Sequence, residues 1–259
     1  RILAQRPDAT IALPEPFSAQ PSDAPTLMRL VCLVPDGSRV LAALNQVLTQ
    51  SEDPQLRFAA YFGLWIDAVL ASPSALGGLS PEARRLADKL NEIDNRHPMW
   101  LMRRWQAEYA NGHDVEAAES AKSLAQLGVD VRGLAASKSE LPALWAAEDA
   151  SRLGLVEVAL AAHERLPETI RQRPDVLLEY VRLLGLAGRS VDAKNALLSS
   201  AIGHDAIRLE AFLMRAKSGE AEAVRSELQA MAKADEALRV APASLAWLRA
   251  ILDYYSPLK

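Results

Sequence analysis

Residues 187–193 read Ala-Gly-Arg-Ser-Val-Asp-Ala, and this short stretch shows the plan on which the second half of the chain is built. A helix-forming run precedes Gly188, and a small apolar residue, Ala193, follows the glycine five positions later. Glycine accepts the backbone conformation in which a helix ends and the chain reverses. A small residue on the returning helix lets that helix approach its predecessor closely. We therefore expect this stretch to join two closely packed helices.

The same plan occurs four times in the chain. The glycines, and the small residues five positions after them, are Gly112 with Ala117, Gly154 with Ala159, Gly188 with Ala193, and Gly219 with Val224. The glycines are 42, 34 and 31 residues apart, and a period of about 34 residues is the length of one helix pair with two turns. Prolines 12 or 14 residues before the first three glycines mark helix starts. The pattern predicts first helices from about residues 98, 141, 174 and 205, and returning helices from about 114, 155, 190 and 220.

These segments resemble the tetratricopeptide repeat (TPR) family, whose units have the same glycine-to-alanine spacing. The resemblance covers roughly residues 96–237 and implies a right-handed α-solenoid of antiparallel helix pairs. The family's small residue seven positions before the glycine is matched roughly by Ala147 and Val181, but not by Trp105 and Phe212. The first repeat also carries eight extra residues, which we expect in the loop 129–140. A generic solenoid of helix pairs therefore stays open as an alternative.

The regions outside the repeats also favour an all-α fold. Residues 1–25 contain five prolines, which predict an extended Pro-rich arm. Residues 26–95 are expected to form an N-terminal helical region with HEAT-like or TPR-like pairs: a short helix over 26–34, a pair over 38–71 and a helix from 81 to about 95. Residues 238–259 are expected to form a capping helix at the exposed end of the solenoid. Ala and Leu, which favour helices, dominate the apolar residues, and aromatic residues make up only 5%.

Composition and charge exclude several classes of function. The net charge is −4 and no cluster of Lys or Arg is present, so nucleic acid is not expected as a partner. The single cysteine, Cys32, cannot form an internal disulfide and is expected to be a buried apolar residue. No run of 18 apolar residues occurs, so no membrane span is expected in this segment.

We expect a cytoplasmic protein, with a periplasmic location or the soluble face of an inner-membrane protein as alternatives. Because the chain begins at Arg1 and not at Met, we expect a processed form or a piece of a longer protein, from which a signal or anchor could have been removed.

The sequence contains no recognisable catalytic or metal-binding motif. Its four histidines are far apart, and none has a partner at helical metal-ligand spacing. No phosphate-binding glycine loop and no Gly-x-Ser-x-Gly motif occurs. We therefore predict no catalytic residue, no cofactor and no metal. His97, His113 and His204 are expected in turns, and His163 is expected to pack in the interior.

The most distinctive segment is residues 99–109, which is rich in Met, Trp and Tyr. The family resemblance implies that the first helix of each pair lines a concave groove. On that face we expect the partner-binding residues Met102, Gln106, Tyr109, Glu148, Leu178 and Arg182. Adaptable Met and aromatic side chains suit a peptide or a helix of a protein partner. The sequence thus predicts a non-enzymatic interaction scaffold. One alternative is the soluble TPR part of a bacterial membrane-associated assembly, such as one for exopolysaccharide synthesis or export. Another, less favoured, is an enzyme with a dispersed site.

Overall fold

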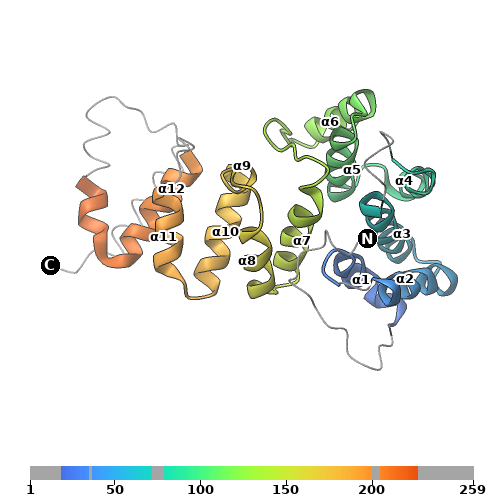
Figure 1. Ribbon diagram of the computed structural model, residues 1–259, viewed down its shortest axis with the longest axis horizontal. Coiled ribbons are helices and arrows are strands. Elements are labelled where there is room, and N and C mark those ends of the chain that lie inside the picture. The colour runs from blue at the N-terminus through green and yellow to red at the C-terminus, as the bar shows by residue number, and fades with distance from the viewer. Residues whose placement is uncertain (1–18, 35–36, 72–78, 200–204, 227–259) are drawn as a thin grey trace. The chain divides into compact units, whose positions relative to one another are not determined.

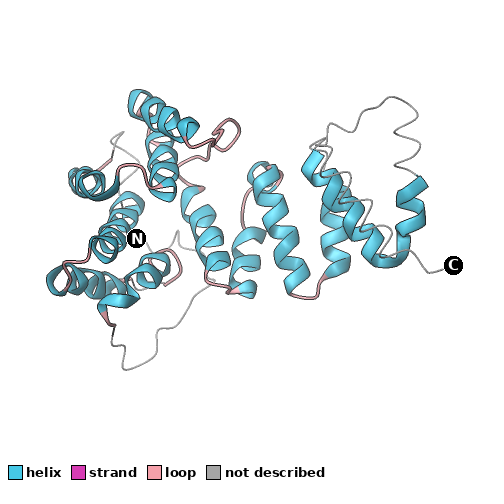
Figure 2. Cartoon of the chain, turned by 180° about the vertical axis from the view of Figure 1, so that it is seen from behind, coloured by secondary structure: helices cyan, strands magenta, loops and turns pink. Residues whose placement is uncertain are grey.

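The computed structural model describes residues 19–34, 37–71, 79–199 and 205–226 (Figure 1). These residues form helices joined by turns and loops, with no strand among them, which confirms the all-α prediction for this part of the chain (Figure 2). Two compact units are present, residues 1–167 and residues 168–259, and each is described by itself. The predicted arm over 1–18, the capping helix over 238–259 and His204 lie outside the described residues.

The first unit begins with a short helix that starts earlier than predicted. A 3-10 turn, η2 (Pro21–Asp23), leads into α1 (Ala24–Leu30), so the end of the expected extended arm, residues 21–25, is helical. Proline is compatible with this position because the first turn of a helix needs no backbone donor. The expected helix over 26–34 ends four residues early, at Leu30, and a turn follows.

Three longer helices follow α1 in the expected places. They are α2 (Ser38–Gln50), α3 (Pro54–Ala71) and α4 (Pro81–Asp94). The side chain of Asp53 accepts hydrogen bonds from backbone N–H groups in the first turn of α3, and Ser80 does the same for α4. These caps satisfy donors that a helix start leaves open.

Helix α3 lies at the centre of the N-terminal helices and packs against α1, α2 and α4. Its buried residues lie on several sides, and they include Phe58, Phe62, Trp65 and Ile66. Gly63 allows the closest approach, because a Cβ at this position would lie 2.6 Å from Leu44 Cδ1 and 3.1 Å from the backbone of Met28. A residue without a side chain is therefore required where α3 crosses α1 and α2.

The repeat region of the first unit forms two helix pairs. Helix α5 (Pro98–Ala110) packs against α6 (Asp114–Gln126), and α7 (Leu141–Arg152) packs against α8 (Val156–Glu164). Every one of these helices starts within one residue of the predicted position. The turn glycines Gly112 and Gly154 adopt φ of 72° and 71°, a region that residues with a side chain enter only at a cost.

The extra residues of the first repeat form the connection between α6 and α7, as predicted. Helix α6 ends at Gln126 and α7 begins at Leu141. Val129, Val131 and Leu134 from this connection pack against the core of the α5–α6 pair. The loop therefore covers apolar surface of that pair.

The second unit repeats the same plan in its described part. It contains α9 (Glu168–Arg171), α10 (Pro174–Leu186), α11 (Ser190–Ser199) and α12 (Asp205–Arg215), followed by a kinked turn, η4 (Ala216–Glu220). Helix α11 packs against both α10 and α12. The two turn glycines of this unit, Gly188 and Gly219, also have positive φ, and residues 221–226 continue as a helix. No helix in the described ranges combines the length and apolar character that crossing a membrane requires.

Candidate ligand-binding cleft

The first unit contains a cleft of about 490 Å³ where α1, α3 and α5 approach one another beside the end of α4. The described residues that line it are Pro25, Met28, Arg29, Pro54, Gln55, Phe58, Ala59, Ile93, Asp94, His97 and Met99. Apolar walls and a small number of polar groups are typical of ligand sites, whose volumes are about 300–1,000 Å³. A second hollow of about 230 Å³, lined mainly by polar residues of the α4–α5 turn and the end of α6, is half that size.

The apolar walls of the cleft are formed by residues that the helix cores hold in place. Met28 and Phe58 are buried, and the Phe58 ring lies 4.7 Å from the ring of His97, measured between centroids. Phe58 also packs edge-on against Phe62, which belongs to the interior of α3. The walls are therefore continuous with the core and do not depend on surface side chains alone.

His97 fixes the start of α5 at the edge of the cleft. Its Nδ1 accepts a hydrogen bond from the backbone N–H of Trp100 at 3.4 Å, so the imidazole caps the helix. Burial lowers the pKa of His97 below the ordinary imidazole value; nearby Asp94 acts in the opposite direction, and Arg29 adds to the lowering. A neutral ring is the form that accepts this capping hydrogen bond.

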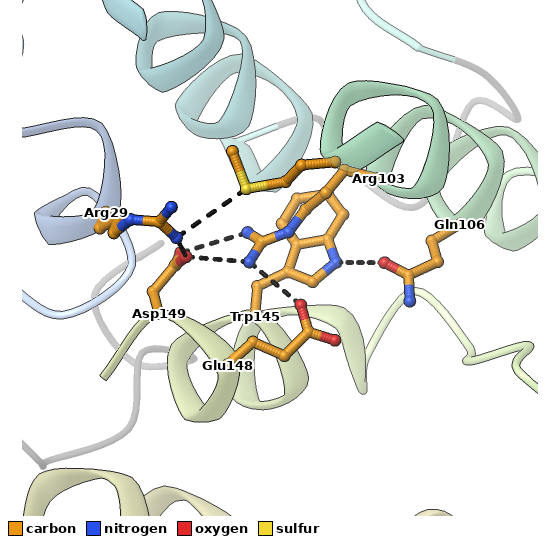
Figure 3. Close-up of polar contacts among 7 residues, drawn as sticks. Arg29, Arg103, Gln106, Trp145, Glu148 and Asp149 are labelled. Carbon is orange, nitrogen blue, oxygen red and sulfur yellow. Dashed lines mark hydrogen bonds and ion pairs between the residues drawn. The ribbon is translucent and has the colours of Figure 1, made fainter. Parts of the chain in front are cut away.

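Arg29 brings a positive charge into the cleft from α1. Its side chain is 21% exposed, and its Nη1 donates to Asp149 Oδ1 on α7 at 3.4 Å and contacts Met99 Sδ at 3.8 Å. Figure 3 shows Arg29 reaching Asp149 from the α1 side, opposite Arg103. Arg29 thus belongs both to the cleft and to an interhelix ion pair.

Behind the cleft lies a buried ion pair between α5 and α7. Arg103 donates from two nitrogens to the two carboxylate oxygens of Asp149 at 3.1 and 3.2 Å, and both side chains are almost fully buried (Figure 3). Nη2 of Arg103 also lies 3.2 Å from Glu148, and its guanidinium stacks on the ring of Trp145. Trp145 in turn donates through Nε1 to Gln106 Oε1 at 2.8 Å. These contacts fix α5 against α7.

Burial and the neighbouring charges shift the pKa values of Arg103 and Asp149 in opposite directions. Burial lowers the pKa of Arg103, but the neighbouring carboxylates of Asp149 and Glu148 outweigh it and raise that pKa. Burial raises the pKa of Asp149, despite the opposite effect of Arg103 and Arg29. Each group is therefore costly to bury as an ion unless the other is present.

An aromatic cluster joins the same helices on their inner sides. Trp65 of α3 lies 4.8 Å from Trp100 of α5 and 5.9 Å from Trp145 of α7, between ring centroids. All three rings are fully buried, and Trp100 donates to Asn91 of α4 at 3.0 Å. The cluster links α3, α4, α5 and α7, and the first three of these helices also contribute residues to the cleft.

The predicted partner-binding residues occupy different environments. Tyr109 is 51% exposed and packs on the ring of Trp105, whereas Met102 is half-buried beside the α5–α6 core. Gln106 is buried and Glu148 half-buried, and both take part in the α5–α7 contacts described above. The buried position of Gln106 does not fit the exposed groove face expected for it, because its amide is used inside the protein.

The other two predicted residues lie on α10 in the second unit. Leu178 is half-buried, and Arg182 is exposed and forms an ion pair with Glu179 at 2.7 Å.

The structure also tests the burial and turn positions predicted for several aromatic, histidine and cysteine residues. Trp100, Trp105, His163 and Cys32 are buried, as expected. His97 and His113 are in turns, as expected, but each is half-buried and accepts a backbone hydrogen bond.

The sequence interpretation missed Arg29, Arg103 and Asp149. A signal was present for Arg103, which is three residues after Trp100 and four before Ala107, and so shares the buried face of α5. A charged residue on an apolar helix face indicates a buried partner. The sequence does not show which of the many acidic residues is that partner.

The described residues contain no cluster of His, Cys, Asp and Glu side chains that could hold a metal ion. Comparison of the chain with protein-family models, with curated proteins and with solved structures finds no match. The cleft is therefore interpreted from its own residues.

Proposed function

We propose that this chain is a non-enzymatic interaction module that holds a peptide segment of a protein partner. In this proposal the helix pairs form a right-handed solenoid of the TPR type, and the cleft between α1, α3 and α5 is the binding site. The observation that carries the proposal is this preformed hollow of about 490 Å³, walled by Met, Phe and Pro side chains. Flexible Met side chains adapt to different apolar groups of a ligand.

The polar groups of the cleft favour binding over catalysis. Among the lining residues that the structure describes, none is a Ser, Thr, Cys or Lys that could act as a nucleophile. His97 uses Nδ1 to cap α5, and Asp94 accepts a hydrogen bond from the backbone N–H of Arg96. Each of these groups thus accepts a hydrogen bond from the backbone, and no hydrogen bond joins the two side chains in the described structure.

A steric block at the mouth of the cleft tests the proposal. Gln55 is exposed and lines the cleft, so Gln55→Trp should fill the opening without disturbing the core. A random peptide library displayed on phage would be selected against the immobilised full chain. We expect specific peptides to be enriched on the unmodified chain and lost on Gln55→Trp.

Two further variants make the result specific. Gln46 is an exposed residue of α2 outside the cleft, so Gln46→Trp is the matched control and should enrich the same peptides as the unmodified chain. Tyr109→Ala tests the exposed face of α5. Loss of binding in Tyr109→Ala with retention in Gln55→Trp would move the site to that face, and equal enrichment on all variants would contradict a site at either place.

A further inference from the structure

The cleft contains a cation whose hydrogen-bonding capacity is only partly used. A guanidinium carries five N–H donors in a planar fork. In Arg29 only Nη1 is engaged, at the long distances of 3.4 Å to Asp149 and 3.8 Å to the sulfur of Met99. Arg29 makes no other hydrogen bond to the part of the chain that the structure describes. Its remaining donors are therefore free to bind a ligand.

The charge of Arg29 is also incompletely balanced. Asp149, its carboxylate partner, is shared with Arg103, which holds it more closely, at 3.1 and 3.2 Å through two nitrogens. Burial lowers the pKa of Arg29, and the positive charges of Arg152 and Arg103 add to this effect, against the pull of Asp149. An additional anion beside Arg29 would relieve this excess of positive charge.

The start of α5 at the cleft also favours an anion. The first turn of α5 contains no acidic residue, whereas the start of α3 is already capped by the carboxylate of Asp53. The partial positive charge of a helix N-terminus favours a nearby anion. Asp94, the one acidic side chain among the described lining residues, is exposed at the end of α4, where solvent and salt screen its charge.

We propose that Arg29 is the specificity determinant of the cleft and that the cleft prefers a peptide with an Asp or Glu carboxylate next to a bulky apolar side chain. The carboxylate pairs with the free edge of the Arg29 guanidinium, and the apolar side chain packs among Met28, Phe58 and Met99. This inference rests on the proposed function, because it names the chemistry of the peptide that the cleft would take.

Peptides selected from the random library provide the test. Each enriched peptide is synthesised in pairs, with its acidic residue as Glu or Gln, and the affinities are measured by isothermal titration calorimetry. For the unmodified chain we expect the Glu peptide to bind about tenfold more tightly than the Gln peptide, as is typical of a charge-assisted hydrogen bond. For Arg29→Gln we expect the two peptides to bind equally.

Two variants control for effects on folding. Arg29→Lys keeps the charge and its link to Asp149, and it should keep part of the preference for Glu even if Arg29→Gln unfolds. Arg152→Gln removes an exposed positive charge that is close to Asp149 but outside the cleft lining, and it should reduce the preference for Glu much less than Arg29→Gln does.

The possible failures are distinguishable. Peptides that bind the cleft and are blocked by Gln55→Trp, but show no difference between Glu and Gln, would overturn the role of Arg29 and leave the proposed function standing. A preference for Glu that persists in Arg29→Gln would also overturn it. Absence of any cleft-dependent peptide would overturn both.

Discussion

Arg103 and Asp149 form the most deeply buried charged pair in the described residues, and their energetics follow from that burial. Both side chains are removed from water, and each replaces much of the hydration that the other loses, with smaller contributions from Glu148 and Arg29. Removing one partner of a buried pair leaves an uncompensated charge, whereas replacing both by apolar side chains removes the cost of burial as well.

A double-mutant cycle on this pair should show that asymmetry. We expect Asp149→Leu alone to lower the free energy of unfolding by about 3–5 kcal/mol, because Arg103 would keep only the half-exposed Glu148 as its partner. Adding Arg103→Met should restore a large part of that loss, since Met keeps the contact with the ring of Trp145. Urea unfolding followed by circular dichroism measures both values.

The surface pair Asp130–Arg132 is the matched control for the cycle. Its groups approach to 2.6 Å, but both are well exposed, so solvent weakens their attraction. Asp130→Asn should leave the unfolding midpoint unchanged. Arg103→Met alone completes the cycle. Equal destabilisation by Asp149→Leu and by the double variant would mean that Arg103 without Asp149 carries no penalty, which contradicts the expected asymmetry.

At the residue scale, the sequence predicted burial better than it predicted pairing. Trp100 and Trp105 were placed correctly in the interior because helical spacing puts them among apolar neighbours. Gln106 was placed on the groove face, yet its amide accepts a hydrogen bond from Trp145, 39 positions later in the chain. Such contacts depend on how helices from different repeats meet, and local spacing does not determine this.

At the scale of the helices, the turn glycine was the most reliable signal. All four repeated glycines have positive φ, and no neighbouring atom lies within 4 Å of the Cβ position at any of them. The requirement for glycine at these turns therefore comes from the backbone and not from lack of space. Helix α10 offers a direct comparison, because Gly185 lies within the helix and Gly188 at the turn that follows it.

Alanine substitutions at these two glycines should have opposite effects. Gly188→Ala must place a side chain at φ of 74°, and we expect it to destabilise the α10–α11 pair by about 1 kcal/mol. Gly185→Ala has open space and no positive φ, and should stabilise the pair by about 0.5 kcal/mol through helix propensity. Hydrogen exchange of the α10 and α11 amides reports both changes. If both substitutions changed the stability of the α10–α11 pair in the same direction, helix propensity or available space, and not the sign of φ, would determine the effect of alanine at these positions.

The boundaries of the helices could be predicted where prolines and glycines mark them, and less well elsewhere. The repeat helices begin within one residue of their predicted positions. Helix α1 was displaced by two residues because Pro25 was interpreted as part of an extended arm, although the first turn of a helix accepts proline. The cleft was not predicted, since it depends on α1, α3, α4 and α5 meeting in space.

At the scale of the whole molecule, net charge and local charge have opposite signs at the proposed site. The chain carries a net charge of −4 at pH 7, so its long-range field opposes the approach of an acidic peptide. Arg29 acts over a short range and from a half-buried position, where salt screens it less. The two effects should therefore separate when ionic strength is varied.

We expect the association rate of an acidic peptide to rise with salt. Between about 0.01 and 0.15 M ionic strength the screening length falls from about 30 to about 8 Å, which removes the long-range repulsion and leaves the contact with Arg29 largely intact. The dissociation rate should change less, because it depends on that contact. Stopped-flow fluorescence anisotropy with a labelled peptide measures both rates, and the paired Gln peptide, with less negative charge, should show the smaller salt effect. An association rate that falls as salt is added would show that the field around the cleft is attractive at long range, and that basic residues beyond Arg29 guide the peptide to it.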